Sequence, residues 1–295
     1  MRKMKDSGIS WLGEIPTDWE AVKIKHALKE RKENNKPQKT DNILSLLKDR
    51  GVIPYREKGD IGNKSKENLE DYKLAYPGDI VLNSMNVIIG SVGLSKYFGA
   101  VSPVYYMLKN RYSKDSIEYF NYVFQTEEFQ KSLIGYGNGI LAHRMRIQML
   151  KLNTVMIPYP LPELQKEIST YLDQKVDFID NIIEKTKESI KEYKKYKQSL
   201  ITETVTKGLN PNVKMKDSGI EWIGEVPEHW EARKLKYDFE IVKRIAGELG
   251  YNVLSITQQG LKVKDIVSND GQQSSDYSKY QHVYSGDYAM NLWIC

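Results

Sequence analysis

The pattern of hydrophobic and polar positions changes character along the chain. Over residues 1–160 the apolar side chains fall in short alternating or continuous runs, which predict β-strands at 20–25, 43–47, 80–82, 87–94, 100–108 and 155–157. Residues 116–124 and 127–133 instead place apolar side chains at helical spacing. This mixture predicts an α+β domain of ordinary size.

Glycine-containing segments separate the predicted strands. Pro77-Gly78-Asp79 stands directly before one apolar run and predicts a turn, and Gly99 lies between two further runs and also predicts a turn. The sequence Gly135-Tyr136-Gly137-Asn138-Gly139 predicts a flexible loop.

Residues 163–206 have a different pattern, without Pro or Gly and dense in Lys and Glu. Here the steps between apolar positions alternate between three and four, which predicts one long helix with an imperfect heptad repeat. Its length is about 65 Å at ~1.5 Å per residue. We call this row the apolar seam; it consists of Val176, Ile179, Ile183, Ile190 and Leu200, and it passes through Thr186, Tyr193 and Lys197.

An apolar row on so long a helix requires a partner, because it cannot remain in water alone. The sequence therefore predicts dimerisation through this helix, or docking onto another subunit. The helix is expected to end at Lys207-Gly208, with Pro211 shortly beyond.

The chain also repeats itself at the scale of a whole domain. Residues 4–26 and 215–237 are identical at 15 of 23 positions, and weaker similarity continues as far as Asn291 with the offset falling from 211 to 208. At residue 295 the second copy has reached only the equivalent of position 87. We therefore expect a second domain that is incomplete and loosely ordered, produced by a frameshift or an early stop.

These patterns together predict three parts. A first α+β domain spans 1–160, a coiled-coil-type helix spans 163–207, and a partial second copy of the first domain spans 210–295. The fold class is α+β, with mixed sheet and helices followed by the long helix.

Composition excludes fewer classes of function than the repeat does. Lys and Arg number 44 against 39 Asp and Glu, so the formal charge of +5 permits nucleic-acid binding without requiring it. The only cysteine is Cys295, which excludes an internal disulfide or a cysteine zinc site. The polar N-terminus predicts no signal peptide, and no apolar run approaches the ~20 residues of a membrane helix, so the expected location is the cytoplasm.

Motifs for catalysis are missing from the sequence. It contains neither a GxxxxGK[ST] nucleotide loop nor the Asn/Asp-Pro-Pro-aromatic tetrapeptide of amino-methyltransferases. Its four histidines, His26, His143, His229 and His282, show no metal-ligand spacing. We therefore predict no catalytic residue, no metal site and no cofactor bound by this chain.

In combination, these features resemble the specificity subunits of type I restriction-modification systems, over essentially all of residues 4–295. The repeats of that family often open with a segment like Ser7 to Pro16 followed by Trp19, and its recognition domains commonly contain a turn and strand like Pro77 to Val81. They commonly end in a run like Ile157 to Ile168, which leads into the spacer helix. The chain departs from the family in length, because most of a second recognition domain and a second spacer helix are missing.

The resemblance implies a subunit that catalyses nothing itself. Each recognition domain reads one half of a split target in double-stranded DNA, and the helices fix the gap and dock methyltransferase (modification) subunits. Those subunits use S-adenosylmethionine to methylate adenine, and a restriction subunit that uses ATP and Mg²⁺ joins them. A half-length chain would form a homodimer through the spacer helix and read a palindromic site.

The candidate DNA contacts are basic and amide or hydroxyl side chains in predicted loops, because cations bind phosphates and polar groups read base edges. They form three groups. The first is Arg56, Lys58, Lys64 and Lys66; the second is Asn83, Ser84 and Asn86; the third is Asn138, His143, Arg144 and Arg146.

Two other functions remain compatible with the sequence. In the first, the chain is an interaction adaptor whose globular domain binds protein. In the second, it is a non-functional truncation product or a silent cassette for recombination. The sequence leaves the target bases open.

Overall fold

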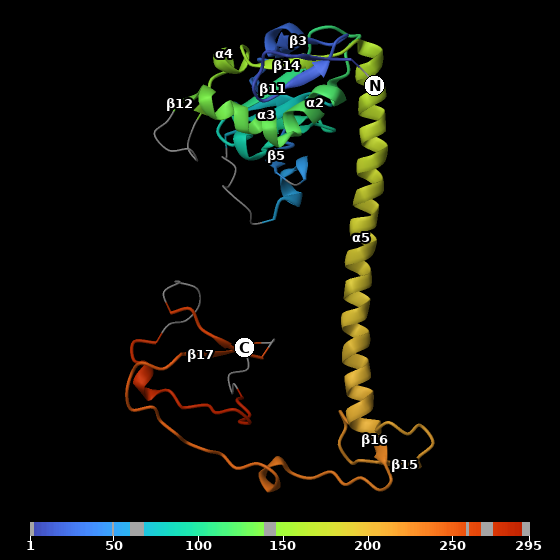
Figure 1. Ribbon diagram of the computed structural model, residues 1–295, viewed down its shortest axis with the longest axis vertical. Coiled ribbons are helices and arrows are strands. Elements are labelled where there is room, and N and C mark those ends of the chain that lie inside the picture. The colour runs from blue at the N-terminus through green and yellow to red at the C-terminus, as the bar shows by residue number, and fades with distance from the viewer. Residues whose placement is uncertain are drawn as a thin grey trace. The chain divides into compact units, whose positions relative to one another are not determined.

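Four antiparallel strands form the main sheet, in the order β4 (Leu28–Glu30), β11 (Tyr105–Asn110), β8 (Ile80–Asn83) and β9 (Val92–Leu94). The computed structural model describes residues 3–48, 50–59, 68–138, 146–257, 260–266 and 274–290. It divides into two units, residues 1–191 and 192–295, which are described separately. The main sheet belongs to the first unit (Figure 1).

Both faces of this sheet are covered, because successive side chains of a strand point to opposite sides. On one face Leu82 and Leu108 pack with Phe120 and Phe124 of α2 (Ile117–Gln125), and α3 (Glu127–Ser132) adds Phe129 to the same core. On the other face Val81 and Met107 pack against small strand pairs. Figure 1 shows α2 and α3 lying against the sheet.

The other elements of the first unit are short. β1 (Met4–Asp6) pairs with β2 (Glu14–Pro16), and β3 (Glu20–Lys23) pairs with β14 (Met156–Tyr159). β5 (Leu44–Leu47) pairs with β6 (Gly51–Pro54), β7 (Lys73–Ala75) pairs with β10 (Gly99–Val101), and β12 (Gly137–Asn138) pairs with β13 (Arg146–Ile147). The short helices are α1 (Ile24–Ala27) and α4 (Met149–Leu152), with 3₁₀ turns at Tyr55–Glu57, Val87–Ile89 and Leu133–Tyr136.

The predicted α+β class with a long helix is confirmed, but three strand predictions were too long. The run over 100–108 is two strands, because β10 ends at Val101 and β11 begins only at Tyr105. The run over 20–25 ends as a strand at Lys23, because Ile24 begins α1. The run over 87–94 begins with a 3₁₀ turn, and Gly90 ends that turn in the left-handed region at φ 90°. Only its last part, β9, is a strand, so an apolar run alone did not distinguish the two conformations.

Gly99 lies in a strand, which corrects its predicted position in a turn. It is the first residue of β10, and β10 pairs with β7. A Cβ atom at this position would lie 2.5 Å from the carbonyl oxygen of Asn42 and 2.7 Å from Cγ of Leu44. Glycine is required here by close packing of two backbones, not by a turn.

The predicted long helix is present as α5 (Pro162–Lys207), which is continuous over 46 residues. The helix begins with Pro162 followed by Glu163, and both residue types are favoured in the first turn of a helix. Gly208 follows its last residue with φ 77°. Every residue from 173 to 203 is exposed, including the apolar seam. No described helix is both long enough and apolar enough to cross a lipid bilayer.

The second unit contains two hairpins that match hairpins of the first. β15 (Met215–Asp217) and β16 (Glu225–Pro227) have the register of β1 and β2 shifted by 211 residues. β17 (Leu254–Thr257) and β18 (Gly260–Val263) form a hairpin like β5 and β6. Among the described residues after 207, Val226 is the one buried hydrophobic side chain.

We predict that Gly99→Ala lowers the free energy of unfolding by about 2 kcal/mol, because the new methyl group overlaps fixed backbone and forces β10 away from its neighbour. Urea unfolding followed by circular dichroism measures the change. Gly135→Ala is the matched control, because nothing lies within 4 Å of its Cβ position and its φ is ordinary. Equal unfolding curves for the two variants would contradict the close-packing explanation.

Candidate nucleic-acid interface

Ser84, a predicted DNA contact, is buried at the end of β8. Its hydroxyl donates to the carbonyl oxygen of Val104 at 2.7 Å, and its own carbonyl accepts the amide hydrogen of Ile147 at 2.9 Å. The residue therefore holds β13 against the main sheet. Ser84 therefore contributes to an interface indirectly, because it positions Arg146, the residue next to Ile147.

Asn83 also has internal partners. Its side chain is 9% exposed, and its Oδ1 accepts the amide hydrogen of Met85 at 3.0 Å. Asn86 is half-exposed, and its carbonyl accepts amide hydrogens from Ile89 and Ser91. Asn83 therefore shapes the loop after β8, whereas the Asn86 side chain lies at the surface of that loop.

The first predicted group is only partly described. Arg56 is exposed on the 3₁₀ turn after β6. Lys58 is 8% exposed, and its ammonium lies 4.7 Å from the centre of the Tyr55 ring. Lys64 and Lys66 lie outside the described residues.

The third group lies on and between β12 and β13. Asn138 and Arg146 are opposite each other in this antiparallel pair, so the two strands join the ends of the segment that contains His143 and Arg144. His143 and Arg144 themselves lie outside the described residues. Arg146 is exposed. The base of this segment is therefore fixed to the domain by β13 and its bond to Ser84.

Two lysines join Arg146 in what we call the cationic cluster, Lys32, Lys73 and Arg146. The Lys73 ammonium donates to the Tyr105 carbonyl at 2.7 Å and lies 5.0 Å from the Tyr106 ring centre. The Tyr106 hydroxyl in turn donates to the carbonyl of Ile147 at 3.2 Å, directly beside Arg146. One tyrosine thus brings β7 and β13 together.

The charges of this cluster act on one another. Burial lowers the pKa of the Lys73 ammonium below its ordinary value, and the positive charges of Arg146 and Lys32 lower it further, while Glu30 opposes them. The Lys32 side chain is 81% exposed. A surface with crowded cations and one nearby carboxylate is suited to bind phosphate, which relieves the repulsion among the cations.

Sequence reasoning missed Lys32 and Lys73. Neither residue stands in a loop with other candidates, and β7 was not among the predicted strands. Lys73 lies near Arg146 because Tyr106 contacts both Lys73 and the carbonyl of Ile147. No local sequence signal indicates contacts between residues so far apart in the chain.

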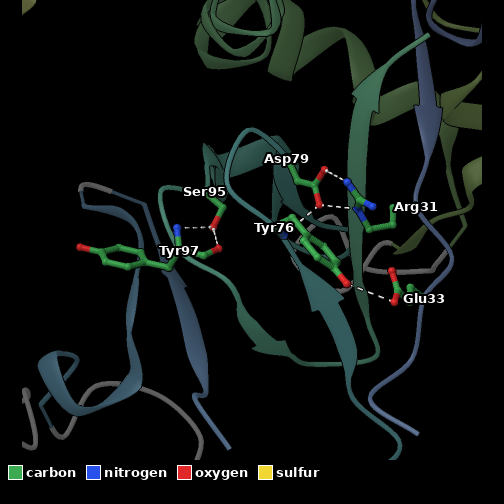
Figure 2. Close-up of polar contacts among 6 residues, drawn as sticks. All are labelled: Arg31, Glu33, Tyr76, Asp79, Ser95 and Tyr97. Atoms are coloured by element: carbon green, nitrogen blue, oxygen red, sulfur yellow. Dashed lines mark hydrogen bonds and ion pairs between the residues drawn. The ribbon is translucent and has the colours of Figure 1, made fainter. Parts of the chain in front are cut away.

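A second polar cluster fixes the predicted turn at Pro77-Gly78-Asp79, where Gly78 has φ 84°. Asp79 is 1% exposed and accepts two hydrogen bonds from the Arg31 guanidinium, at 2.7 and 3.0 Å. Arg31 also lies 4.3 Å from the centre of the Tyr76 ring. In Figure 2 the Tyr76 hydroxyl reaches Glu33, at 3.1 Å.

The turn is further joined to the neighbouring strand. Backbone hydrogen bonds connect Gly78 and Asp79 with Ser95. The Ser95 hydroxyl, seen in Figure 2, bonds both the carbonyl and the amide of Tyr97. This cluster positions the start of β8, at whose end the predicted residues Asn83 and Ser84 lie.

The second unit contains an equivalent ion pair. Arg244 donates to Asp287 at 2.6 Å and lies 4.9 Å from the centre of the Tyr284 ring. The Tyr284 amide donates to Asp287, as the Tyr76 amide donates to Asp79. These bonds lower the pKa of the Asp287 carboxyl below its usual range.

The described residues were also compared with what a metal site requires. No three His, Cys, Asp or Glu side chains within the described ranges are grouped to hold a metal ion. The described part of the first unit presents a cationic cluster beside the paired strands β12 and β13.

Comparison with known proteins places these features in context. Residues 16–192, more than half of the chain, match the family model described as Type I restriction modification DNA specificity domain. Three specificity subunits of type I restriction enzymes from Methanocaldococcus jannaschii are similar in sequence. The protein named for MjaX is 29% identical over 237 residues, the MjaVIII subunit is 29% identical over 228, and the MjaIX subunit is 25% identical over 185.

The similarity is partial in extent. The alignments to the MjaX and MjaVIII proteins cover 76% and 75% of this chain but 53% and 49% of the relatives, so the chain spans about half the length of those proteins. Among solved structures, the HsdS subunit of Thermoanaerobacter tengcongensis is 19% identical with a TM-score of 0.43, covering 70% of this chain and 48% of that one. A structure described for assembly of the type I R-M system is 18% identical with a TM-score of 0.46, covering 66% and 47%.

We predict that Lys32→Ala combined with Arg146→Ala weakens binding to duplex DNA and lowers the slope of log K against log salt by about 2, one for each lost phosphate contact. Fluorescence anisotropy over a salt series measures both quantities. Lys5→Ala combined with Lys114→Ala removes the same charge from other exposed positions and serves as the control. An unchanged salt slope in the first variant would remove the cluster from the interface.

Proposed function

The chain belongs to the family of type I restriction-modification DNA specificity domains, and on that premise we propose that it is the DNA-reading subunit of such a system. In this proposal it recognises a sequence in double-stranded DNA and directs adenine methylation and restriction, which partner subunits perform. The chain itself supplies no catalytic group, and it acts where the cell's DNA lies, in the cytoplasm.

The observation that carries this proposal is the fixed junction between the domain and α5. Gln165 is fully buried; its side chain accepts the Ser116 amide hydrogen at 3.0 Å and donates to the Pro160 carbonyl at 2.9 Å. Nearby the Ser169 and Ser116 hydroxyls lie 3.3 Å apart. A domain held at a set angle on a continuous helix suits a protein that must place a DNA-reading surface at a defined distance.

A second tie supports the same role one turn further along. The Tyr122 hydroxyl of α2 donates to Asp173 of α5 at 2.7 Å. Burial, together with the charge of Asp173, raises the pKa of the Tyr122 hydroxyl, so it remains a donor at physiological pH. Both ties therefore join α2 to the first turns of α5.

The cationic cluster supplies the proposed contact with DNA. Lys32, Lys73 and Arg146 bind phosphates, and Asn138 at the end of β12, together with His143 and Arg144 in the segment between β12 and β13, contacts the base edges. Asn86 and Arg56 extend the contact from neighbouring loops. Asn83, Ser84 and Lys58 act in this proposal by holding those loops, since their side chains are buried.

The proposed partners follow from the family. Methyltransferase subunits bind S-adenosylmethionine and flip the target adenine out of the duplex, and a restriction subunit supplies the ATP- and Mg²⁺-dependent steps. The exposed apolar seam of α5 is the proposed contact surface, either for these subunits or for a second copy of this chain. A pair of copies would read a site with two-fold symmetry.

The test of this function is to express the chain with the methyltransferase subunit encoded in its own genome. We expect the two to co-purify, and sequencing of methylated bases should show a set of methylated adenines that disappears when this gene is deleted. Co-purification without any methylation change would favour the protein-interaction adaptor. If the two proteins do not co-purify and methylation does not change, the result would favour the non-functional product or silent cassette.

The junction generates a more specific prediction. Gln165→Leu keeps the volume but removes both hydrogen bonds and leaves the Ser116 amide without its acceptor, so the domain can tilt on α5. We expect methylated sites with the same half-site bases but more than one gap length. Gln174→Leu, at an exposed position of the same helix, is the control. A single unchanged gap in the Gln165 variant would show that the junction does not set the spacing.

A further inference from the structure

The second unit repeats backbone contacts that surround the main sheet of the first. The isolated bridge between Asn34 and Lys73 of the first unit recurs as a bridge between Ile245 and Gln281. These residues are offset by 211 and 208, the same offsets that relate the two copies of the repeat. Together with the two matching hairpins and the equivalent ion pair at the turn, this bridge shows that the second unit has the same local frame.

The strand that this frame surrounds in the first unit is β11. It pairs with β4 on one side and with β8 on the other. By the offsets of the repeat, residues 239–241 are the counterpart of β4, and residues 288–290 are the counterpart of the first three residues of β8. Neither of these described segments is a strand, and the strands described after residue 207 all belong to the two hairpins. Both segments therefore lack the neighbour that β11 provides in the first unit.

Apolar side chains of these two segments are exposed. Phe239, the counterpart of Leu28, is 51% exposed, whereas Leu28 is 1% exposed in the first unit. Met290, the counterpart of the fully buried Leu82, is also exposed. The rings of Phe239 and Tyr288 lie 5.3 Å apart, so the two segments are neighbours in space. Neighbouring extended segments with unpaired backbone and uncovered apolar side chains can accept an added strand.

The hairpin of β17 and β18 offers an apolar face to the same strand. Ile256 and Leu261 are paired across it, at the positions of Leu46 and Val52 in the first unit. There, Leu46 and Val52 are buried in one cluster with Met107 of β11. In the second unit Ile256 is 44% exposed and Leu261 43% exposed. The hairpin thus keeps the apolar residue types that pack with β11, although they are exposed.

A second copy of this chain does not fit this position. Its own β11 is already held in its first unit, where Met107 and Leu108 are buried and both edges of the strand are paired. Its second unit would bring only the same exposed hairpin. The occupant therefore has a strand that is not yet part of a sheet, and this strand is apolar on both faces, as the consecutive residues Met107 and Leu108 are.

We propose that the second unit is a docking surface for an extended segment of another polypeptide, which adds to it in the place that β11 has in the first unit. The backbone of this segment pairs with residues 239–241 and 288–290, and its apolar side chains cover Ile256 and Leu261. The docked segment completes a second recognition domain, and this consequence rests on the DNA-reading function proposed above.

The test measures binding of a fluorescent peptide with the sequence of residues 99–111, which contains β10 and β11, to the full chain by anisotropy. We expect saturable binding. Ile256→Asp should weaken it by at least about tenfold, because the docked strand would bury the new carboxylate. A peptide with Met107→Asp should bind as weakly, for the same reason.

Ser255→Asp is the matched control for the hairpin variant. It adds the same charge one position away, on the opposite face of β17, and should leave peptide binding unchanged. Circular dichroism confirms that both variants are folded. Absence of binding, or equal affinities of the Ile256 and Ser255 variants, would overturn the proposal.

Hydrogen exchange followed by mass spectrometry locates the added strand. Amides of residues 239–241 and 288–290 should exchange more slowly when the peptide is bound, whereas those of the first unit should not change. Protection confined to other segments would contradict strand addition.

Light scattering of the full chain distinguishes a second copy as the occupant. A dimer that is lost in Ile256→Asp and kept in Ser255→Asp would mean that a second copy covers the hairpin, and it would overturn the proposal. These measurements contain no DNA, so their failure would leave the DNA-reading proposal standing.

Discussion

An apolar row on a continuous helix is the constraint on which the other features of this chain depend. α5 exposes Ile179, Ile183 and Ile190 to solvent along a stretch in which no residue is buried. Removing such side chains from water stabilises a protein by about 1.5–3 kcal/mol each, so a single chain leaves this stabilisation unused. A partner that covered this row would recover the stabilisation, and the domain fixed to the first turns of α5 would then take its direction from the assembly proposed above.

The helix and most core elements could be predicted because their signals are local. The spacing of apolar residues over 163–206 and the absence of Gly and Pro there specify one helix within a single segment. Gly99 shows where local signals fail, because its reason for being glycine is the carbonyl of Asn42, 57 positions earlier. A turn and a close backbone contact look the same in a sequence.

The candidate interface was less predictable for the same reason. The sequence suggested Ser84 as a DNA contact from its residue type and its position after a strand, but its partners are Val104 and Ile147, which only the folded chain brings near. Conversely, Lys73 joins Arg146 through two contacts of Tyr106. Residue type identifies groups capable of binding DNA, whereas burial decides which of them remain free to do so.

The two copies of the repeat show what the fold itself requires. The backbone bond from Leu74 to Glu33 corresponds to the bond from His282 to Arg244, so Arg244 stands at the position of Glu33, two residues beyond that of Arg31. Its guanidinium nevertheless reaches Asp287, as Arg31 reaches Asp79. Residues two apart on an extended segment point to the same side, so either position can supply the cation. What is retained is a guanidinium at the aspartate of the turn. In the first unit this partner allows the carboxylate of Asp79 to be buried at the start of β8. In the second unit the ion pair is kept although no described residue after Asp287 is buried.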